Sequence, residues 1–218
     1  MNQVYLDHAA ATPLDERVLA AMSPYFSHKF YNPSSSYRPA LAVAKDLLAA
    51  RASVAHWLGA KPAEIVFTAG GTEADNLAIH GVMRQFPAAN LVVSVVEHKA
   101  VLYPATGYDC RLAPVDNQGL VAPEKIKNLI DDKTALVSII YANNEIGTIQ
   151  PIKKIGQIVK QIRVKRLEVG NNLPLYFHTY ACQAPAYLDL HAARLGVDLM
   201  SLNGGKIYGP KQSGVLFV

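Results

Sequence analysis

Short apolar runs that alternate with longer helical patterns constrain this chain more than any other feature of its sequence. Most of the intervening segments have helical character, including residues 73–86 after the first run and the basic stretch 153–166 before the fifth. Such alternation is typical of a largely parallel β-sheet covered by helices on both faces. We therefore predict an α/β fold with a seven-stranded, mostly parallel sheet. The seven runs are EIVFT (64–68), LVVSVV (91–96), CRLAPV (110–115), ALVSIIY (135–141), LYFH (175–178), DLMSL (198–202) and GVLFV (214–218).

Two helices are expected before the sheet begins. They cover residues 13–26 and 37–60, and Gly59 closes the second of them. The third apolar run is the weakest of the predicted strands, because Pro114 cannot donate a ladder hydrogen bond.

The composition favours a soluble, cytoplasmic globular protein. Half of the residues are hydrophobic and only 17% are charged, so the chain can bury a sizeable core. The start of the sequence lacks the pattern of a signal peptide, and no apolar run approaches the roughly 18 residues of a membrane span. Cys110 and Cys182 form no CxxC pair, which argues against a disulfide framework or a zinc site.

The positive charge of the chain does not indicate a nucleic-acid partner. The net charge is only +4, and its densest basic cluster shares residues 152–166 with regularly spaced isoleucines. That spacing describes an amphipathic helix with a solvated basic face. Since no nucleic-acid reading motif accompanies it, we expect no direct nucleic-acid binding.

Polar, chemically capable residues follow five of the apolar runs directly. In an open parallel sheet these positions share one edge, where ligands bind in the crevice outside the carboxyl ends of the strands. Five separate motifs therefore converge on one predicted site. They are AGGTE (69–73), EHKA (97–100), ANNEIG (142–147), HTYACQ (178–183) and NGGKIYGPK (203–211).

The AGGTE segment leaves a strand and opens a helix, which is a favourable place for an anion. Glycines let backbone N–H groups approach the anion, and Thr72 adds a hydroxyl donor. An ordinary glycine turn with Thr72 as N-cap is the alternative. No GxGxxG is present, and Ile207 after Gly205-Lys206 does not fit a P-loop, so a cofactor phosphate is favoured over a nucleotide.

Lys206 lies in a glycine-rich loop between two apolar strands. A lysine there is partly desolvated, and a desolvated amine is a competent Schiff-base former. The alternative is an exposed loop lysine. Its predicted position at the same sheet edge as AGGTE favours the chemical interpretation.

The motifs together resemble one family from end to end. They are similar to the successive signatures of the cysteine desulfurase group of the class V aminotransferase-like enzymes. The resemblance implies the large domain of a fold type I enzyme that depends on pyridoxal 5′-phosphate. The matching segments are YLDHAAATPLDERVLAAM, NPSS, EIVFTAGGTEADNLAI, EHKAVL, YANNEIGTIQPI, ACQA, LGVDLMSL and KIYGPK.

The resemblance also implies a domain organisation. Residues 1–14 correspond to an N-terminal arm that is associated with the small domain in the family, and residues 15–218 to the cofactor-binding large domain. The chain covers a little over half of a usual member, and the C-terminal small domain is absent from it. In the family that part brings the persulfide cysteine and the arginine that holds the substrate carboxylate.

Residue by residue, the resemblance assigns roles around the cofactor. Lys206 holds the cofactor as a Schiff base and moves the proton, and His98 stacks on the pyridine ring. Without the motif context, His98 reads equally well as a satisfied core histidine and Asn144 as a turn residue. By the resemblance, Gly71 and Thr72 bind the phosphate, and Asn144 and Gln183 address the polar ring substituents and the substrate.

The activity implied is removal of sulfur from L-cysteine, which yields L-alanine and an enzyme persulfide for iron–sulfur cluster assembly or tRNA thiolation. The implied partners are a second copy or an intact relative in a dimer, and a scaffold or thiolation protein that accepts sulfur. Two alternatives stay open. One is a catalytically silent remnant or binding module that pairs with an intact relative or scaffold, and the other is a related lyase such as one acting on selenocysteine.

Five positions depart from the family pattern: Tyr31 and Tyr37 stand where a glycine and a histidine are usual, and three more lie around the predicted cofactor site. Tyr180 stands where an aspartate pairs with the pyridine nitrogen, and a phenol with a pKa of about 10 is neutral at pH 7. A charge-assisted bond worth roughly 1.5–3 kcal/mol thus falls to about 1 kcal/mol. Asn203 replaces a serine or threonine and Gly205 a histidine, both phosphate ligands in the family. We expect weakened cofactor binding and slower proton abstraction.

Overall fold

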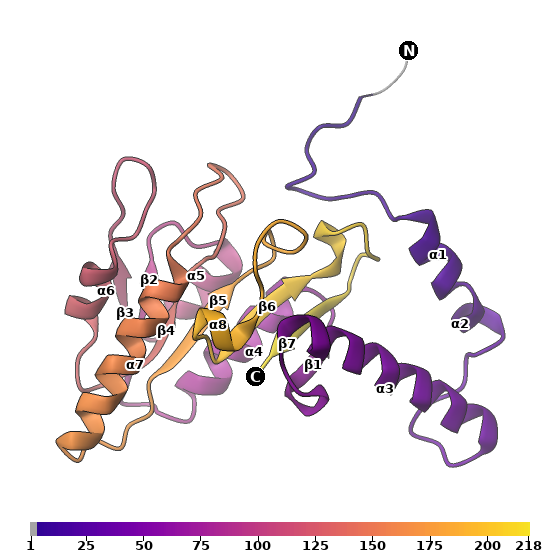
Figure 1. Cartoon of the computed structure of the whole chain (residues 1–218), viewed down its shortest axis with the longest axis horizontal. Coiled ribbons are helices and arrows are strands. Elements are labelled where there is room, and N and C mark those ends of the chain that lie inside the picture. The colour runs from indigo at the N-terminus through magenta and orange to yellow at the C-terminus, as the bar shows by residue number, and fades with distance from the viewer. Residues whose placement is uncertain (1–3) are drawn as a thin grey trace.

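The computed structural model describes residues 4–218 and contains one seven-stranded sheet. Its order is β1-β7-β6-β5-β4-β2-β3 (Figure 1). The four neighbouring pairs from β6 to β3 are parallel, whereas β7 is antiparallel to both β1 and β6. The predicted α/β fold with a mostly parallel sheet is confirmed. The strands are β1 (Ile65–Thr68), β2 (Asn90–Ser94), β3 (Asp109–Ala113), β4 (Thr134–Ser138), β5 (Tyr176–Tyr180), β6 (Leu199–Asn203) and β7 (Gly214–Phe217).

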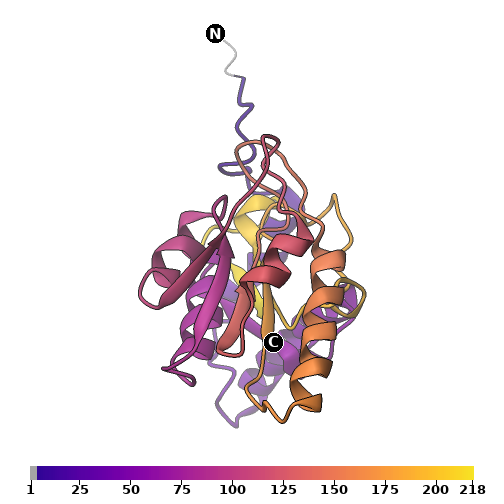
Figure 2. The ribbon, with the colours of Figure 1, turned by 90° about the vertical axis from the view of Figure 1, so that its left-hand side faces the viewer.

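Helices cover both faces of the sheet, as Figure 2 shows from the side. The contacts of α4 run across the sheet from β1 to β4, and α5 packs beside it on β2. On the opposite face, α7 packs on β5, α6 on β3, and α8 on α7. The helices are α1 (Glu16–Met22), α2 (Pro24–Ser27), α3 (Arg38–Leu58), α4 (Gly71–Met83), α5 (Lys99–Ala105), α6 (Pro123–Leu129), α7 (Ile152–Glu168) and α8 (Ala192–Leu195), with single 3₁₀ turns at Pro62–Glu64 and Gly204–Lys206.

Proline explains two of the differences between the predicted elements and the structure. The expected helix over 13–26 is wrong as a single element, since α1 ends at Met22 and α2 begins at Pro24. Proline has no N–H for the i→i−4 hydrogen bond, so the helix breaks there. The third strand was expected to reach residue 115 but stops at Ala113, directly before Pro114.

The first three helices form an extension away from the sheet (Figure 1). Within the 21 residues of α3, only Ala40, Val43, Ala55 and Leu58 are buried. Gly59 ends the helix in the left-handed conformation, with φ of 63°. Apolar side chains therefore stay exposed along this extension, among them Leu19, Phe26, Phe30, Leu48 and Trp57.

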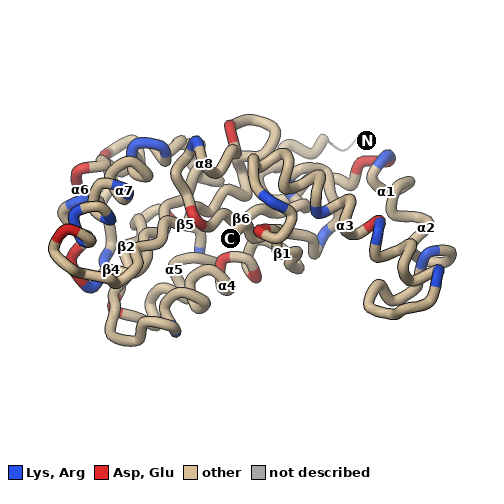
Figure 3. Tube along the Cα trace, turned by 60° about the horizontal axis from the view of Figure 1, so that its bottom comes forward, with Lys and Arg blue, Asp and Glu red and all other residues tan. Residues whose placement is uncertain are grey.

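Charged residues of both signs lie around α6 and α7, at the end of the molecule opposite α1 and α2 (Figure 3). The lysines of α7 are exposed and its other side buries Ile152, Ile155, Ile158 and Val159, but Arg166, expected on the solvated face, is buried and donates to the carbonyls of Asp131 and Thr134. No helix within residues 4–218 combines the length and the apolar character that crossing a membrane requires.

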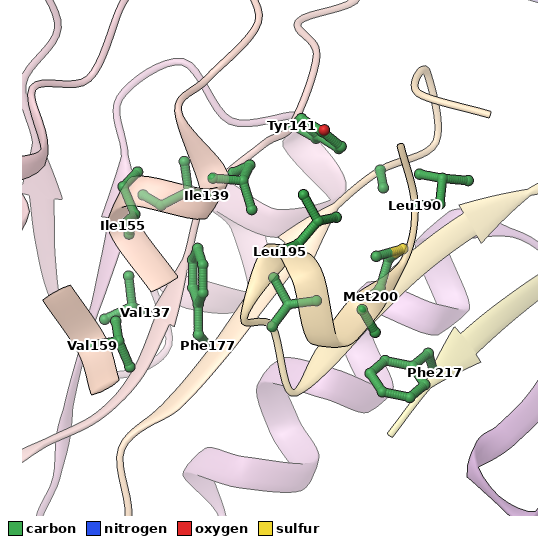
Figure 4. Packing of buried hydrophobic residues seen from close by; sticks show 14 of the residues in the cluster. Val137, Ile139, Tyr141, Ile155, Val159, Phe177, Leu190, Leu195, Met200 and Phe217 are labelled. Atoms are coloured by element: carbon green, nitrogen blue, oxygen red, sulfur yellow. The ribbon is translucent and has the colours of Figure 1, made fainter. Parts of the chain in front are cut away.

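The core consists of two apolar clusters, one on each face of the sheet. Alternation along β2 separates them: Leu91 and Val93 belong to the cluster under α4 and α5, and Val92 to the cluster under α6, α7 and α8. Figure 4 shows the second cluster, with Phe177 of β5 between Val137 and Leu195. This packing fixes the carboxyl ends of the parallel strands, where the predicted site residues lie.

Candidate functional site

One cavity of about 440 Å³ brings together residues that follow β1 and β6. Because β1 and β6 are both antiparallel to β7, they run in the same direction and their carboxyl ends share an edge. Four of the predicted site residues line this cavity, which we call the first cavity: Gly71, Thr72, Asn203 and Lys206, with Gly205 beside them.

The glycine turn before α4 exposes the first amides of that helix to the first cavity. Gly70 is its N-cap with φ of 144°, a conformation that favours glycine, and no side chain caps the helix. A Cβ on Gly71 would lie 2.6 Å from Sγ of Cys182, so the turn approaches β5 more closely than any other residue allows. Thr72 is exposed on the cavity wall. Amides at a helix N-terminus together with a hydroxyl suit a phosphate group.

The amine of Lys206 points across the cavity to the N-terminal segment. Its Nζ donates hydrogen bonds to the carbonyl oxygens of Ala9 at 2.6 Å and Ala10 at 2.8 Å. Nε2 of Gln183 donates to the same Ala9 oxygen at 2.8 Å. The segment that carries Ala9 therefore lies directly over two of the predicted site residues.

Asn203 and Gly205 form a local turn. Oδ1 of Asn203 accepts a hydrogen bond from the Gly205 N–H at 2.9 Å, and the Gly205 carbonyl accepts from N and Oγ1 of Thr12, each at 3.1 Å. This geometry leaves the amide group of Asn203 as the remaining donor of that side chain toward the cavity. Gly205 offers no side-chain donor.

His98 and Tyr180 are stacked on one another. Their ring centroids are 5.1 Å apart and their planes differ by 6°. His98 caps α5, and its Nδ1 accepts from the Ala100 N–H at 3.1 Å. Partial burial is the main reason that the pKa of His98 lies below its usual range, and the nearby charge of Lys206 lowers it further. The imidazole is therefore neutral at pH 7.

A second cavity of about 540 Å³ lies between the segment that carries His98 and the loop that follows β4. His98 and Asn144 both line it, and it shares no lining residue with the first cavity. Asn143 holds the loop in place, because its Oδ1 accepts from the N–H groups of Glu145 and Ile146 and its Nδ2 donates to Val96 O. The side chain of Asn144 takes no part in these hydrogen bonds.

Two buried acids near the site were missed by the sequence analysis. Burial raises the pKa of Asp75 to about 8 and that of Glu97 to about 8. Oε1 of Glu97 accepts from Ser94 Oγ and from the Ile140 N–H, each at 2.6 Å. The signal for Asp75 was its place on the buried side of α4, one residue after Ala74 and four after Gly71. Perturbed carboxyl groups of this kind are typical of functional sites.

The residues fit only half of a pyridoxal phosphate. The phosphate half fits, because α4 amides, Thr72 and Lys206 face one cavity. The ring half does not fit, because the aromatic ring that stacks on His98 belongs to Tyr180. Tyr180 is only 3% exposed and brings no carboxylate to pair with a pyridine nitrogen.

The α/β fold and the residues at this edge of the sheet were expected to be those of a class V aminotransferase-like enzyme. Comparison with family models gives the same class. Residues 4–218 match the model of the aminotransferase class-V family, so the chain belongs to that family. Proteins of this family, the cysteine desulfurases among them, depend on pyridoxal 5′-phosphate.

The relatives found are cysteine desulfurases. The chain is 40% identical to cysteine desulfurase IscS of Methanosarcina thermophila, covering 99% of this chain and 52% of the relative. It is 41% identical to putative cysteine desulfurase IscS 1 of Bacillus subtilis (strain 168), covering 100% and 56%. The chain thus spans about half the length of these relatives.

Solved structures give the same result. A structure described as SspA in complex with cysteine superposes with a TM-score of 0.89 at 36% identity, covering 99% of this chain and 61% of that one. A NifS-like protein superposes with a TM-score of 0.90 at 33% identity, covering 100% and 59%. The fold is therefore that of the cysteine desulfurases.

Proposed function

We propose that this chain is the cofactor-binding part of a cysteine desulfurase, with Lys206 as the residue that holds pyridoxal phosphate. The observation that carries the proposal is the shared cavity of Lys206, Gly71 and Thr72. In the proposed domain organisation, residues 1–14 are an arm and residues 15–218 the large domain. The contacts of Lys206 and Gln183 with Ala9 support an arm that adjoins the site.

The proposed reaction removes sulfur from L-cysteine and yields L-alanine and a persulfide, for iron–sulfur cluster assembly or tRNA thiolation. The proposed ligands are Gly71 and Thr72 for the phosphate, assisted by Asn203, and Asn144 and Gln183 for the polar groups of ring and substrate. We propose that the activity is impaired, because Tyr180 supplies neither a carboxylate nor space for the ring. A cytoplasmic location stays a prediction.

A dimer is proposed for the same protein, with a second copy or an intact relative as partner and a sulfur-accepting protein as a further one. Exposed apolar side chains along α1 to α3 support an interface there, for example Phe26, Leu48 and Trp57. Light scattering after size-exclusion chromatography tests this part, and a monomer over the whole concentration range would contradict it.

A second candidate function is a binding module without catalysis. The stacked pair of His98 and Tyr180 favours it, because it uses the ring site for a contact within the chain. Retained binding to an intact relative in the absence of cofactor, together with no alanine release from L-cysteine, would select this candidate over the first.

Covalent trapping tests the proposed function. The purified chain is incubated with pyridoxal phosphate, reduced with borohydride and analysed by peptide mass spectrometry, with Lys206→Ala as the variant and Lys125→Ala on α6 as the control. We expect the adduct at Lys206 in the unaltered chain and in the control, and its loss in Lys206→Ala. Equal labelling of surface lysines in all three proteins would overturn the assignment.

A further inference from the structure

Tyr180 is fixed in the protein interior at the end of β5. It pairs in register with Ser201 of β6, which directs its side chain to the face of the sheet that α4 and α5 cover. On this face it joins the apolar cluster that includes Ala74, Val101 and Cys182. With 3% exposure, the side chain is part of the core and not a loose surface group.

The ring of His98 is also fixed, and one face of it is used by Tyr180. His98 is the N-cap of α5, and moving its imidazole would release the hydrogen bond from the Ala100 N–H. The near-parallel rings, 5.1 Å apart, are in offset-stacking contact. A second aromatic ring on that face would have to displace Tyr180.

The two cavities that contain the predicted site residues are separate. The first cavity holds Thr72 and Lys206, and the second holds Asn144 and the edge of His98, and they have no lining residue in common. A ligand with a phosphate group and an attached ring needs one continuous space from Thr72 to His98. Neither cavity joins Thr72 to His98, and Tyr180 covers the face of His98 on which such a ring would stack.

We infer that Tyr180 is a specificity-determining residue whose side chain occupies the ring half of the cofactor site, so that pyridoxal phosphate enters only when this ring leaves His98. The inference rests on the proposed function, because it takes the first cavity as the phosphate half. By this inference Tyr180 has two effects: its side chain excludes the cofactor ring, and it replaces the carboxylate that would pair with the pyridine nitrogen. The phosphate half is not altered by it.

The surroundings of Tyr180 keep its hydroxyl protonated. Burial, with the neighbouring Cys182 and Asp75, raises the pKa of the Tyr180 hydroxyl far above its ordinary value. The side chain is therefore neutral at every physiological pH, and no change of charge helps it to leave. Displacement has to be driven by the ligand or by a substitution.

The test compares cofactor affinity in variants at position 180. Binding of pyridoxal phosphate and, separately, of inorganic phosphate is titrated by ³¹P NMR, which reports binding whether or not a covalent bond forms. We expect Tyr180→Ala to bind pyridoxal phosphate at least about tenfold more tightly than the unaltered chain. Affinity for inorganic phosphate is expected to stay the same. Tyr180→Asp is the second variant, because it removes the ring without leaving a purely apolar cavity.

Phe177→Leu is the matched control. Phe177 lies on the same strand, is fully buried, and faces the opposite side of the sheet. It is expected to leave both affinities unchanged, which separates loss of a core aromatic ring from opening of the site. Circular dichroism confirms that each variant is folded before titration.

Each outcome decides the question. Equal affinity of the unaltered chain and both position-180 variants for pyridoxal phosphate would overturn the inference, as would failure of every protein to bind it while inorganic phosphate still binds. If inorganic phosphate binds to none of them, the phosphate half itself is wrong and the proposed function fails with it. A gain confined to the position-180 variants is the expected result.

Discussion

Oδ1 of Asp75 lies 3.6 Å from Nε2 of His178, yet neither group is charged at pH 7. Both are fully buried, and burial raises the pKa of Asp75 to about 8 and lowers that of His178 to about 3. His178 instead lies between the hydroxyls of Ser138, at 2.8 Å from Nδ1, and Ser201, at 2.9 Å from Nε2. Neither oxygen of Asp75 has a hydrogen-bond partner within residues 4–218. The pair is a neutral contact and not an ion pair.

Asp75 makes the stability of the fold depend on pH. Between its ordinary pKa of 3.8 and its folded pKa of about 8, the folded chain keeps a proton that the unfolded chain has released. The free energy of unfolding therefore falls as pH rises through this window, by about 1.4 kcal/mol per pH unit for this group. Urea denaturation from pH 5 to pH 8 measures this effect. Relative to the unaltered chain, the free energy of unfolding of Asp75→Asn should rise by about 1.4 kcal/mol per pH unit. Glu124→Gln, at an exposed position, is the control, and parallel curves for Asp75→Asn would contradict the burial argument.

Gly71 and Gly81 lie in the same helix and should respond oppositely to alanine. At Gly71 the added Cβ would lie 2.6 Å from Cys182 Sγ, whereas at Gly81 it meets nothing within 4 Å. We expect Gly71→Ala to lower the free energy of unfolding by about 1–3 kcal/mol, and Gly81→Ala to raise it by roughly 0.5–1 kcal/mol. Denaturant unfolding measures both. Cys182→Ala should restore part of the loss in Gly71→Ala, and the absence of any rescue would rule out this contact as the cause.

Lys206 should hold the N-terminal segment in place as well as serving the site. Its two bonds to the Ala9 and Ala10 carbonyls are charge-assisted, and each such bond is worth about 1.5–3 kcal/mol. The amide of the neighbouring Thr12 donates to Gly205 O. In Lys206→Met, hydrogen exchange at the Thr12 amide should accelerate by roughly tenfold or more. Lys125→Met is the control, and unchanged exchange in both variants would show that the segment is held by other contacts.

The turn at Asn203 limits what a histidine at position 205 can restore. A Cβ on Gly205 would lie 3.3 Å from Asn203 Oδ1 and 3.5 Å from Cδ of Lys211. We expect Gly205→His alone to improve affinity for inorganic phosphate by less than about threefold, and Gly205→His with Asn203→Ser by about tenfold. Isothermal titration with inorganic phosphate measures both. A tenfold gain in phosphate affinity from Gly205→His alone would contradict this, because it would mean that the turn at Asn203 accommodates the histidine without loss of affinity.

The sheet was predictable because its signal is local and repeated. Each strand run is apolar and bounded by turn residues, and alternation such as that of Leu91, Val92 and Val93 places side chains on both faces. The direction of β7 was not predictable, since no pattern in GVLFV distinguishes an antiparallel strand from a parallel one. Strand ends shifted by one to three residues, because hydrogen bonding and not hydropathy sets where a ladder stops.

The sequence predicted which residues the sheet edge brings together, but it did not predict the neighbours that side-chain packing creates. Lys206 and Thr72 share a cavity because both directly follow strands that run in one direction. The stack of Tyr180 on His98 depends on side-chain rotamers and on the space between α4 and α5, which no spacing in the sequence encodes. For Asp75 the spacing from Gly71 and Ala74 indicates the buried side of α4, but only packing shows that the carboxyl group is completely buried.

The position of β7 between β1 and β6 has a consequence for how the protein is made. Ile65 pairs with Phe217 and Thr68 with Gly214, and within residues 4–218 β1 has no other strand partner. A ribosome releases β1 and the glycine turn long before it synthesises residues 214–217. During that interval β1 has no place in the sheet, and Gly70 lacks the close backbone contact that Gly214 provides. The proposed phosphate half of the site is therefore completed only after residues 214–217 have been synthesised, so a nascent chain is expected to gain affinity for phosphate only when β7 has been inserted.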